Sequence, residues 1–217
     1  MKRVSGVTKQ AIAIAAFAAV AVSLPSSALN AQTIIDEWAS INAPAAPALK
    51  AVKLDPQTTA LLVLDVVKQG CNAERRPRCL ASLPKMEKLL ADARAKNVMV
   101  VYSVFPGVKL EDTLQQVAPK GGEPSVSALV DKFIGTDLEK TLKDKGITTV
   151  VVVGVAAHGA VLYTGSSAAM RGFQVVVPVD GMSSENTYAE QATAWLLANA
   201  PTVAAKVSLT RSDMITY

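Results

Sequence analysis

Residues 148–160 read Thr-Thr-Val-Val-Val-Val-Gly-Val-Ala-Ala-His-Gly-Ala. The first six form the most β-branched run in the chain, and such side chains fit the pleated surface of a sheet. Because the run is apolar after its two threonines, it predicts a strand buried on both faces, at the centre of a parallel sheet. Gly154 and Gly159 then predict a turn, and the small residues of 160–171 predict a helix that stops at Gly172.

Strand-like and helix-like segments alternate on both sides of this stretch. Further strands are predicted at 59–65, 98–103, 174–179 and 207–209, and further helices at 83–97, 136–146 and 184–199. Thr136 and Glu139 have the spacing of a capping box, and Gly146 is placed to end that helix in the left-handed conformation. Residues 104–125 show no period, and a loop of that length usually lines a site or is disordered. The alternation predicts βαβ units and therefore an α/β fold.

The amino-terminal residues have the composition of a secretory signal peptide. Three basic residues and no acidic ones precede an apolar run at 11–24, and small residues follow, so cleavage is expected after Ala28 or Ala31. The run is shorter than the ~20 residues that span a bilayer, so no retained membrane span is expected. We therefore predict an exported protein, periplasmic or secreted, with a signal peptide at 1–31, an arm at 32–57 and one domain at 58–217.

Charge and cysteine content restrict the partners and the compartment. Removal of residues 1–31 lowers the formal net charge from +4 to about +1, which leaves no basic surface that would favour nucleic acid. Cys71 and Cys79 are the two cysteines. In an oxidising compartment they are expected to pair, and so short a loop gains ~2.5 kcal/mol from the crosslink. A reactive thiol at Cys71 is the alternative.

Asp65 is the first candidate for chemistry. It ends the apolar strand at 59–65, and ligands of open parallel sheets bind beyond the carboxyl ends of the strands. A partly desolvated carboxyl there can act as a proton donor or acceptor, although a plain loop-capping role is the alternative. The loop that follows carries Arg75, Arg76 and Arg78, which would favour a carboxylate-bearing ligand if the loop lies beside the site, and are otherwise solvated.

Four segments together resemble the isochorismatase-like hydrolase superfamily. They are Leu61–Asp65, Phe133–Leu138, Val150–Thr164 and Arg171–Gly181, and they occur in register over residues 58–215. The resemblance implies a three-layer doubly wound fold with a mostly parallel six-stranded sheet flanked by helices. Members of this superfamily often form dimers or tetramers, so the sequence leaves a homo-oligomer open.

The resemblance also implies a site of an Asp, a Lys and a Cys. Asp65 matches the aspartate, and Ala160 stands where the nucleophilic cysteine is expected. The lysine position falls on Ser127, so Lys132 is the nearest candidate catalytic lysine, with a solvated lysine ahead of a helix as the alternative. Because alanine cannot form a thioester, the usual amidase mechanism is not expected.

His158 is the single histidine, two residues before Ala160. Its place at a strand end makes it a candidate general acid, base or ligand contact, with a surface role as the alternative. One histidine without clustered acids predicts no metal site, and we expect no cofactor. The glycine spacing also fits neither a P-loop nor a dinucleotide fingerprint.

Two functions follow from the resemblance. The first is hydrolysis of a small, acidic molecule without a cysteine nucleophile, as in relatives that cleave the vinyl ether of isochorismate-type substrates with the aspartate as general acid. Phe105, Ala157, Gly159 and Ala160 are then expected to line the substrate pocket. The second is a catalytically inactive binding protein with the same fold, and a structural subunit is a third option.

Overall fold

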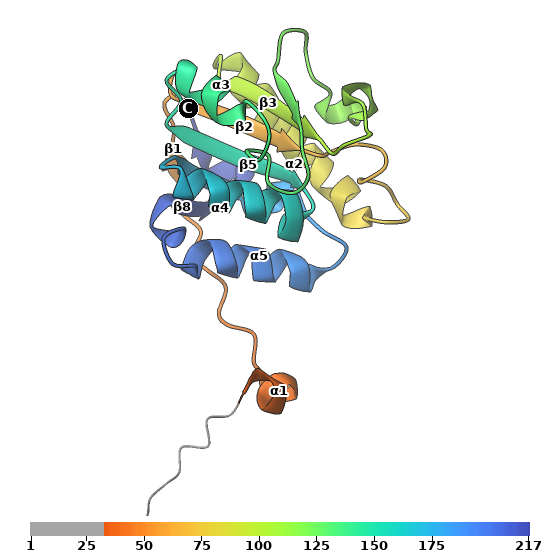
Figure 1. Ribbon diagram of the computed structural model, residues 1–217, viewed down its shortest axis with the longest axis vertical. Coiled ribbons are helices and arrows are strands. Elements are labelled where there is room, and N and C mark those ends of the chain that lie inside the picture. Colours follow the sequence, from red (N-terminus) through yellow and green to blue (C-terminus); the bar gives the residue numbers. More distant parts are fainter. Residues whose placement is uncertain (1–32) are drawn as a thin grey trace, which may run out of the picture. The chain divides into compact units, whose positions relative to one another are not determined.

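The computed structural model describes residues 33–217 (Figure 1). Residues 44–217 form one compact unit, and the predicted signal peptide at 1–31 lies outside the described residues. In the preceding segment, Ile34–Glu37 form a short helix, α1. None of the helices in the described part of the chain is long and apolar enough to cross a membrane.

The main sheet is parallel and has the order β4-β3-β2-β5-β6-β8, with the short β7 paired to β5. Its strands are β2 (Thr59–Leu64), β3 (Met99–Val104), β4 (Ser125–Ser127), β5 (Thr149–Val155), β6 (Gln174–Pro178), β7 (Met182–Ser183) and β8 (Val207–Thr210). A second, two-stranded sheet that the sequence did not reveal pairs β1 (Val52–Lys53) with β9 (Ile215–Thr216). The predicted α/β class with a mostly parallel sheet is confirmed, with the edge strand β4 and the two-residue β7 added.

Helices cover both faces of the main sheet. They are α2 (Pro77–Ala95), α3 (Leu138–Asp144), α4 (Leu162–Met170) and α5 (Thr187–Asn199). Side chains of successive strand residues point to opposite faces, so Leu62 and Val152 pack with α3, α4 and α5, whereas Leu61 and Val151 pack with α2. The two cores give three layers, and Figure 1 shows α4 and α5 together on one side of the strands.

Two local predictions about helices are corrected. No capping box forms at Thr136: its hydroxyl accepts the N–H of Leu138 at 3.2 Å instead of that of Glu139, and the Glu139 side chain pairs with Lys143 and Arg171. Helix α2 begins at Pro77 rather than near residue 83, and proline suits a first helical turn because its missing N–H is not needed there. The predicted left-handed Gly146 is confirmed by its φ of 69°.

The long segment between β3 and β4 is held by α2. Arg94 donates to both carboxylate oxygens of Glu123, to the Tyr102 hydroxyl and to the Ala118 carbonyl oxygen. These bonds fix the far part of the segment against α2, while its middle forms a bridge between Thr113 and Val67, just after β2. Only its beginning, at Phe105, reaches the cavity described below.

Candidate active site

Asp65 lies directly after β2, where the strand order of the sheet reverses between β2 and β5. Its backbone has a φ of 54°, and its N–H donates to the Ser103 carbonyl oxygen at 3.1 Å. The Ser103 hydroxyl donates back to Asp65 Oδ1 at 2.8 Å. The neighbouring strand β3 therefore orients the carboxyl group.

Lys132 lies beneath Asp65 and is fully buried. Its Nζ donates to Asp65 Oδ2 at 2.7 Å, to the Ala128 carbonyl oxygen at 2.8 Å and to the Leu129 carbonyl oxygen at 2.6 Å. An ammonium group has three hydrogens, so all its donors are used. The interpretation of Lys132 as a solvated lysine is therefore wrong. Two of its three partners are backbone carbonyl oxygens. Every residue carries one, so the pattern of side chains in the sequence could not indicate these contacts.

Burial shifts the pKa values of both members of this pair. Desolvation raises the pKa of Asp65 above 3.8, and the attraction of Lys132, its hydrogen bond and that of Ser103 oppose this without cancelling it. Desolvation likewise lowers the pKa of Lys132 below 10.5 against the attraction of Asp65. Removing charges from water costs several kcal/mol per ion, so burial outweighs the mutual attraction here. Asp65 is accordingly easier to protonate than an exposed aspartate.

A cavity of about 310 Å³ opens at the carboxyl ends of β2 and β5. Its lining comprises Asp65, Gly70, Arg75, Arg76, Phe105, Leu129, Val130, Val155, Ala156, His158, Gly159 and Ala160. Phe105, Gly159 and Ala160 line this cavity, and their expected role in binding a substrate stays a prediction. Ala157 does not line the cavity, because its side chain is fully buried in the core beside α4.

The turn after β5 brings the backbone unusually close to β2. A Cβ at Gly154 would lie 2.0 Å from the Leu64 carbonyl oxygen, and the φ of 128° also requires glycine. The peptide bond between Val155 and Ala156 is cis, and Ala157–Val161 then form a π-helical turn before α4. Through this turn Ala160 reaches the cavity wall with a methyl group, which offers no nucleophilic atom.

His158 lies on the same turn with its side chain half exposed. Its Nδ1 is 2.6 Å from the Ser184 hydroxyl, and that hydroxyl donates to Glu185 Oε2 at 2.9 Å. Arg76 Nη2 lies 2.5 Å from the other carboxylate oxygen of Glu185. Strand β7 explains this proximity, because its pairing of Ser183 with Val155 brings the next residue, Ser184, to the turn.

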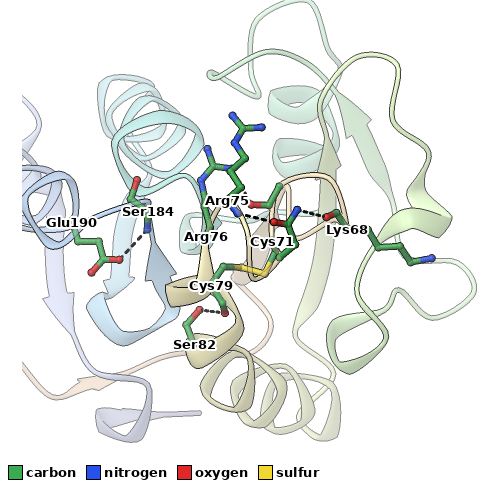
Figure 2. The surroundings of a disulfide bond; sticks show 10 residues. Lys68, Cys71, Arg75, Arg76, Cys79, Ser82, Ser184 and Glu190 are labelled. Carbon is green, nitrogen blue, oxygen red and sulfur yellow. Dashed lines mark hydrogen bonds between the residues drawn. A yellow bond between two sulfur atoms is a disulfide. The ribbon is translucent and has the colours of Figure 1, made fainter.

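Cys71 and Cys79 form a disulfide across the loop that leaves Asp65 (Figure 2). Asn72 organises the loop between them: its side-chain oxygen accepts from the Arg75 N–H, and its carbonyl oxygen accepts from the Arg76 N–H. The cluster of three arginines is thereby divided. Arg75 and Arg76 line the cavity, whereas Arg78 pairs with Glu190.

The sequence assigned no role to three polar residues of the site, Ser103, Ser184 and Glu185, although it placed Ser103 at the carboxyl end of its strand. Each lies just inside or just after a strand, and that position at a carboxyl end was their only available signal. Among residues 33–217, no three His, Cys, Asp or Glu side chains gather as metal ligands would. The expectation of no metal and no cofactor stays a prediction, for which activity or binding retained after chelation is the test.

The sheet order, with a buried acid–lysine pair at the point of strand reversal, is that of an open α/β protein whose site lies at the carboxyl ends of its strands. The isochorismatase domain model matches residues 59–210, and the chain belongs to this family, whose members act on small molecules. The secreted isochorismatase effector Isc1 of Verticillium dahliae is 30% identical over 144 residues, which cover 60% of this chain and 75% of that protein. An uncharacterized isochorismatase family protein, YwoC of Bacillus subtilis, is 24% identical over 172 residues, or 67% of this chain and 88% of the relative.

Solved structures agree on the fold. An isochorismatase from Pseudomonas putida superposes with a TM-score of 0.67 at 14% identity, over 76% of this chain and 93% of the other. The nicotinamidase SaPncA of Staphylococcus aureus gives a TM-score of 0.62 at 20% identity, over 70% of this chain and 98% of the other. The predicted three-layer architecture is therefore that of the family.

Proposed function

We propose that the protein is an exported hydrolase of a small anionic molecule, which uses Asp65 as general acid and base and needs no cysteine nucleophile. The observation that carries the proposal is the buried pair of Asp65 and Lys132 at the wall of a cavity. Lys132 does not itself line this cavity, so it acts through Asp65, whose carboxyl group it holds in place. We therefore treat Lys132 as a positioning residue.

A thiolate mechanism has no support in the described chain. Ala160 occupies the cavity wall where the family resemblance places the cysteine, and both cysteines of the sequence are joined to each other. General acid catalysis needs no nucleophilic side chain, but it does need a carboxyl group that is protonated near its working pH. The raised pKa of Asp65 has the required direction.

The reaction suggested by the family is cleavage of a vinyl ether. Asp65 donates a proton to the terminal vinyl carbon, which leaves a cation stabilised by the ether oxygen. A water molecule adds to this cation and loses a proton, and the resulting hemiketal breaks its carbon–oxygen bond to release a carbonyl compound and an alcohol. Asp65 regains a proton from solvent, so one water molecule is consumed for each bond cleaved.

The charges around the cavity favour an anionic substrate. Asp65 is balanced by Lys132, and Arg76 is balanced by Glu185. Arg75 also lines the cavity, and its side chain has no ion-pair or hydrogen-bond partner among the described residues. One positive charge is therefore in excess, and an arginine binds a carboxylate through paired, charge-assisted hydrogen bonds.

The test is hydrolysis of isochorismate by the wild type and by Asp65→Asn. An amide cannot deliver the proton, and loss of general acid catalysis typically lowers a rate by ~10²–10⁴-fold. Asp144→Asn, an exposed aspartate of α3, is the matched control and should retain full activity. Turnover of isochorismate by Asp65→Asn at the wild-type rate contradicts the mechanism.

The methyl group of Ala160 favours a second candidate, a small-molecule binding protein without activity. Thermal denaturation with isochorismate, dicarboxylates and amides separates the two, because a ligand that binds the folded state stabilises it. Stabilisation with product formation supports the hydrolase, and stabilisation without product supports the binding protein.

Export is the remaining part of the proposal. It is supported by the signal-like residues 1–31, by the disulfide, and by the word "secreted" in the name of the Verticillium relative. Amino-terminal sequencing of the protein recovered outside the cytoplasm should give a start after Ala28 or Ala31. An intact Met1 on that protein contradicts the signal peptide.

A further inference from the structure

The contacts of His158 determine which of its nitrogens carries a hydrogen. The Ser184 hydroxyl is fully buried and makes two short contacts, to Glu185 Oε2 at 2.9 Å and to His158 Nδ1 at 2.6 Å. A hydroxyl has one hydrogen and can donate it to only one of these atoms. If the hydroxyl donates its hydrogen to Glu185, its oxygen can only accept in the contact with His158.

Glu185 is an acceptor in this network because it is ionised. Burial alone would raise the pKa of Glu185, but hydrogen bonds from its own backbone N–H and from Ser184, together with the charge of Arg76, hold it below its usual 4.5. An ionised carboxylate has no hydrogen to donate. The Ser184 hydrogen therefore points to Glu185, and the Ser184 oxygen faces His158 as an acceptor.

It follows that Nδ1 of His158 is the donor in the contact with Ser184. A neutral imidazole has one N–H, so its Nε2 is then an unprotonated acceptor. His158 belongs to the lining of the cavity, and its side chain is half exposed. A lone pair on Nε2 is thus available for a proton from a bound water molecule.

We propose that Ser184 and Glu185 are positioning residues, which hold His158 in the Nδ1–H tautomer so that Nε2 accepts a proton from the water that attacks the substrate. This inference rests on the proposed hydrolysis and assigns the second proton transfer in it. As the oxygen–carbon bond forms, the water proton moves to Nε2. The exposed half of the ring then releases this proton to solvent, while solvent reprotonates Asp65.

The disulfide loop also holds Ser184 and Glu185 in place, through two of its arginines. Arg76 is mostly buried, donates through Nη1 to the Gly70 carbonyl oxygen at 2.9 Å and pairs with Glu185 through Nη2. Arg78 pairs with Glu190. Glu190 in turn accepts the backbone N–H of Ser184 at 2.9 Å (Figure 2). Two of the three clustered arginines therefore hold the Ser184–Glu185 segment, Arg76 directly and Arg78 through Glu190.

The test is nitrogen NMR of the imidazole in tag-free protein. Because the chain has one histidine, the side-chain spectrum contains a single ring. At alkaline pH, where an imidazole is neutral, the wild type should show a protonated Nδ1 and an unprotonated Nε2. A wild-type spectrum dominated by the Nε2–H tautomer overturns the proposal without any variant.

Two variants should change the tautomer in a defined way. Ser184→Ala removes the acceptor for Nδ1–H, so the Nε2–H form should appear. Glu185→Gln places an amide donor beside Ser184, which lets the hydroxyl turn toward His158 and should also favour Nε2–H. Glu87→Gln, an exposed glutamate of α2, is the matched control and should leave the spectrum unchanged. Retention of the Nδ1–H form in both site variants, with the backbone amide spectrum preserved, contradicts the role of Ser184 and Glu185.

The outcome is independent of the hydrolysis test. The tautomer is measured without substrate, so it can be as expected even if Asp65→Asn retains wild-type turnover. Where isochorismate is hydrolysed, Ser184→Ala should lower kcat ~10–100-fold with little change in KM, because loss of a positioned base affects the transition state rather than binding. An unchanged kcat in Ser184→Ala contradicts the inference about Ser184, Glu185 and His158, and leaves the proposed role of Asp65 as general acid unaffected.

Discussion

The two sides of the cavity are built differently. On one side Asp65 lines the cavity, and Ser103 and Lys132 hold its carboxyl group from behind without reaching the cavity; we call these three residues the floor. The ammonium group of Lys132 has two further acceptors, both backbone carbonyl oxygens. Arg75, Arg76 and His158 form its rim: Arg76 pairs with Glu185 and His158 with Ser184, whereas the Arg75 side chain is exposed and has no partner among the described residues. Replacement of a floor residue should therefore affect folding and chemistry together, whereas replacement of a rim residue should affect mainly affinity and proton transfer.

The largest effect is expected from Lys132→Met. The substitution leaves Asp65 buried without its counter-ion, and breaking a buried pair from one side costs ~3–5 kcal/mol of unfolding free energy. Urea denaturation measures the loss, and Lys85→Met, on the exposed face of α2, should change little. The double variant Asp65→Asn/Lys132→Met should recover part of the stability. A loss from Lys132→Met no larger than that from Lys85→Met contradicts the description of the floor.

Opening the disulfide should have a smaller effect. The double variant Cys71→Ser/Cys79→Ser should lose ~2.5 kcal/mol, because the crosslink restricts the unfolded chain over a short loop. Differential scanning calorimetry measures the change, and a reductant should lower the stability of the wild type while leaving the variant unaffected. Equal stability of the wild type with and without reductant speaks against a constraint from Cys71–Cys79.

The difference in unfolding free energy between the wild type and a variant without both floor charges should change with pH through Asp65 and Lys132. The pKa of Asp65 is higher in the folded state than its usual 3.8, so above pH 3.8 the folded state binds more protons than the unfolded one. The contribution of Asp65 to the free energy of unfolding is therefore lost as pH rises through its folded pKa. The folded pKa of Lys132 is lowered, so its contribution is present above 10.5 and is lost as pH falls through its folded pKa.

The double variant Asp65→Asn/Lys132→Met is the reference for this measurement. The stability of the wild type, measured by urea denaturation against that reference, should be lowest between the two pH windows and higher on either side. A relative stability that peaks near neutral pH would mean that attraction between the two charges exceeds the cost of their burial.

The smallest effect on stability is expected at the rim, from Arg75→Gln. Stability should be unchanged, and the affinity for benzoate should fall about tenfold, equivalent to ~1.4 kcal/mol, through loss of the free cation. Benzamide, which has a similar shape and no charge, should bind both proteins equally in calorimetric titrations. Lys68→Gln, an exposed lysine of the same loop that does not line the cavity, is the control. An equal loss of benzoate affinity in both variants would indicate a general effect of net charge.

Some residues of the site could be predicted from the sequence and others could not. Asp65 and the turn around His158 and Ala160 were identified because they end apolar strands, and the ends of parallel strands meet at one edge of the sheet. Lys132 was placed only by resemblance, five residues from the expected position, because two of its three partners are backbone carbonyls. Ser184 and Glu185 were missed because their proximity to His158 depends on β7, which is only two residues long.

The sequence by itself determined the alternation of strands and helices, the parallel class of the sheet, the strand ends that carry the chemistry and the pairing expected of two nearby cysteines. These features depend on local periodicity and composition, which the order of residues contains directly. The tertiary structure alone decided that Lys132 is buried beneath Asp65, that Ala157 faces the core, and that Ser184 and Glu185 bind His158. Each of these contacts joins residues far apart in the chain, and their burial and hydrogen bonding depend on how the layers pack.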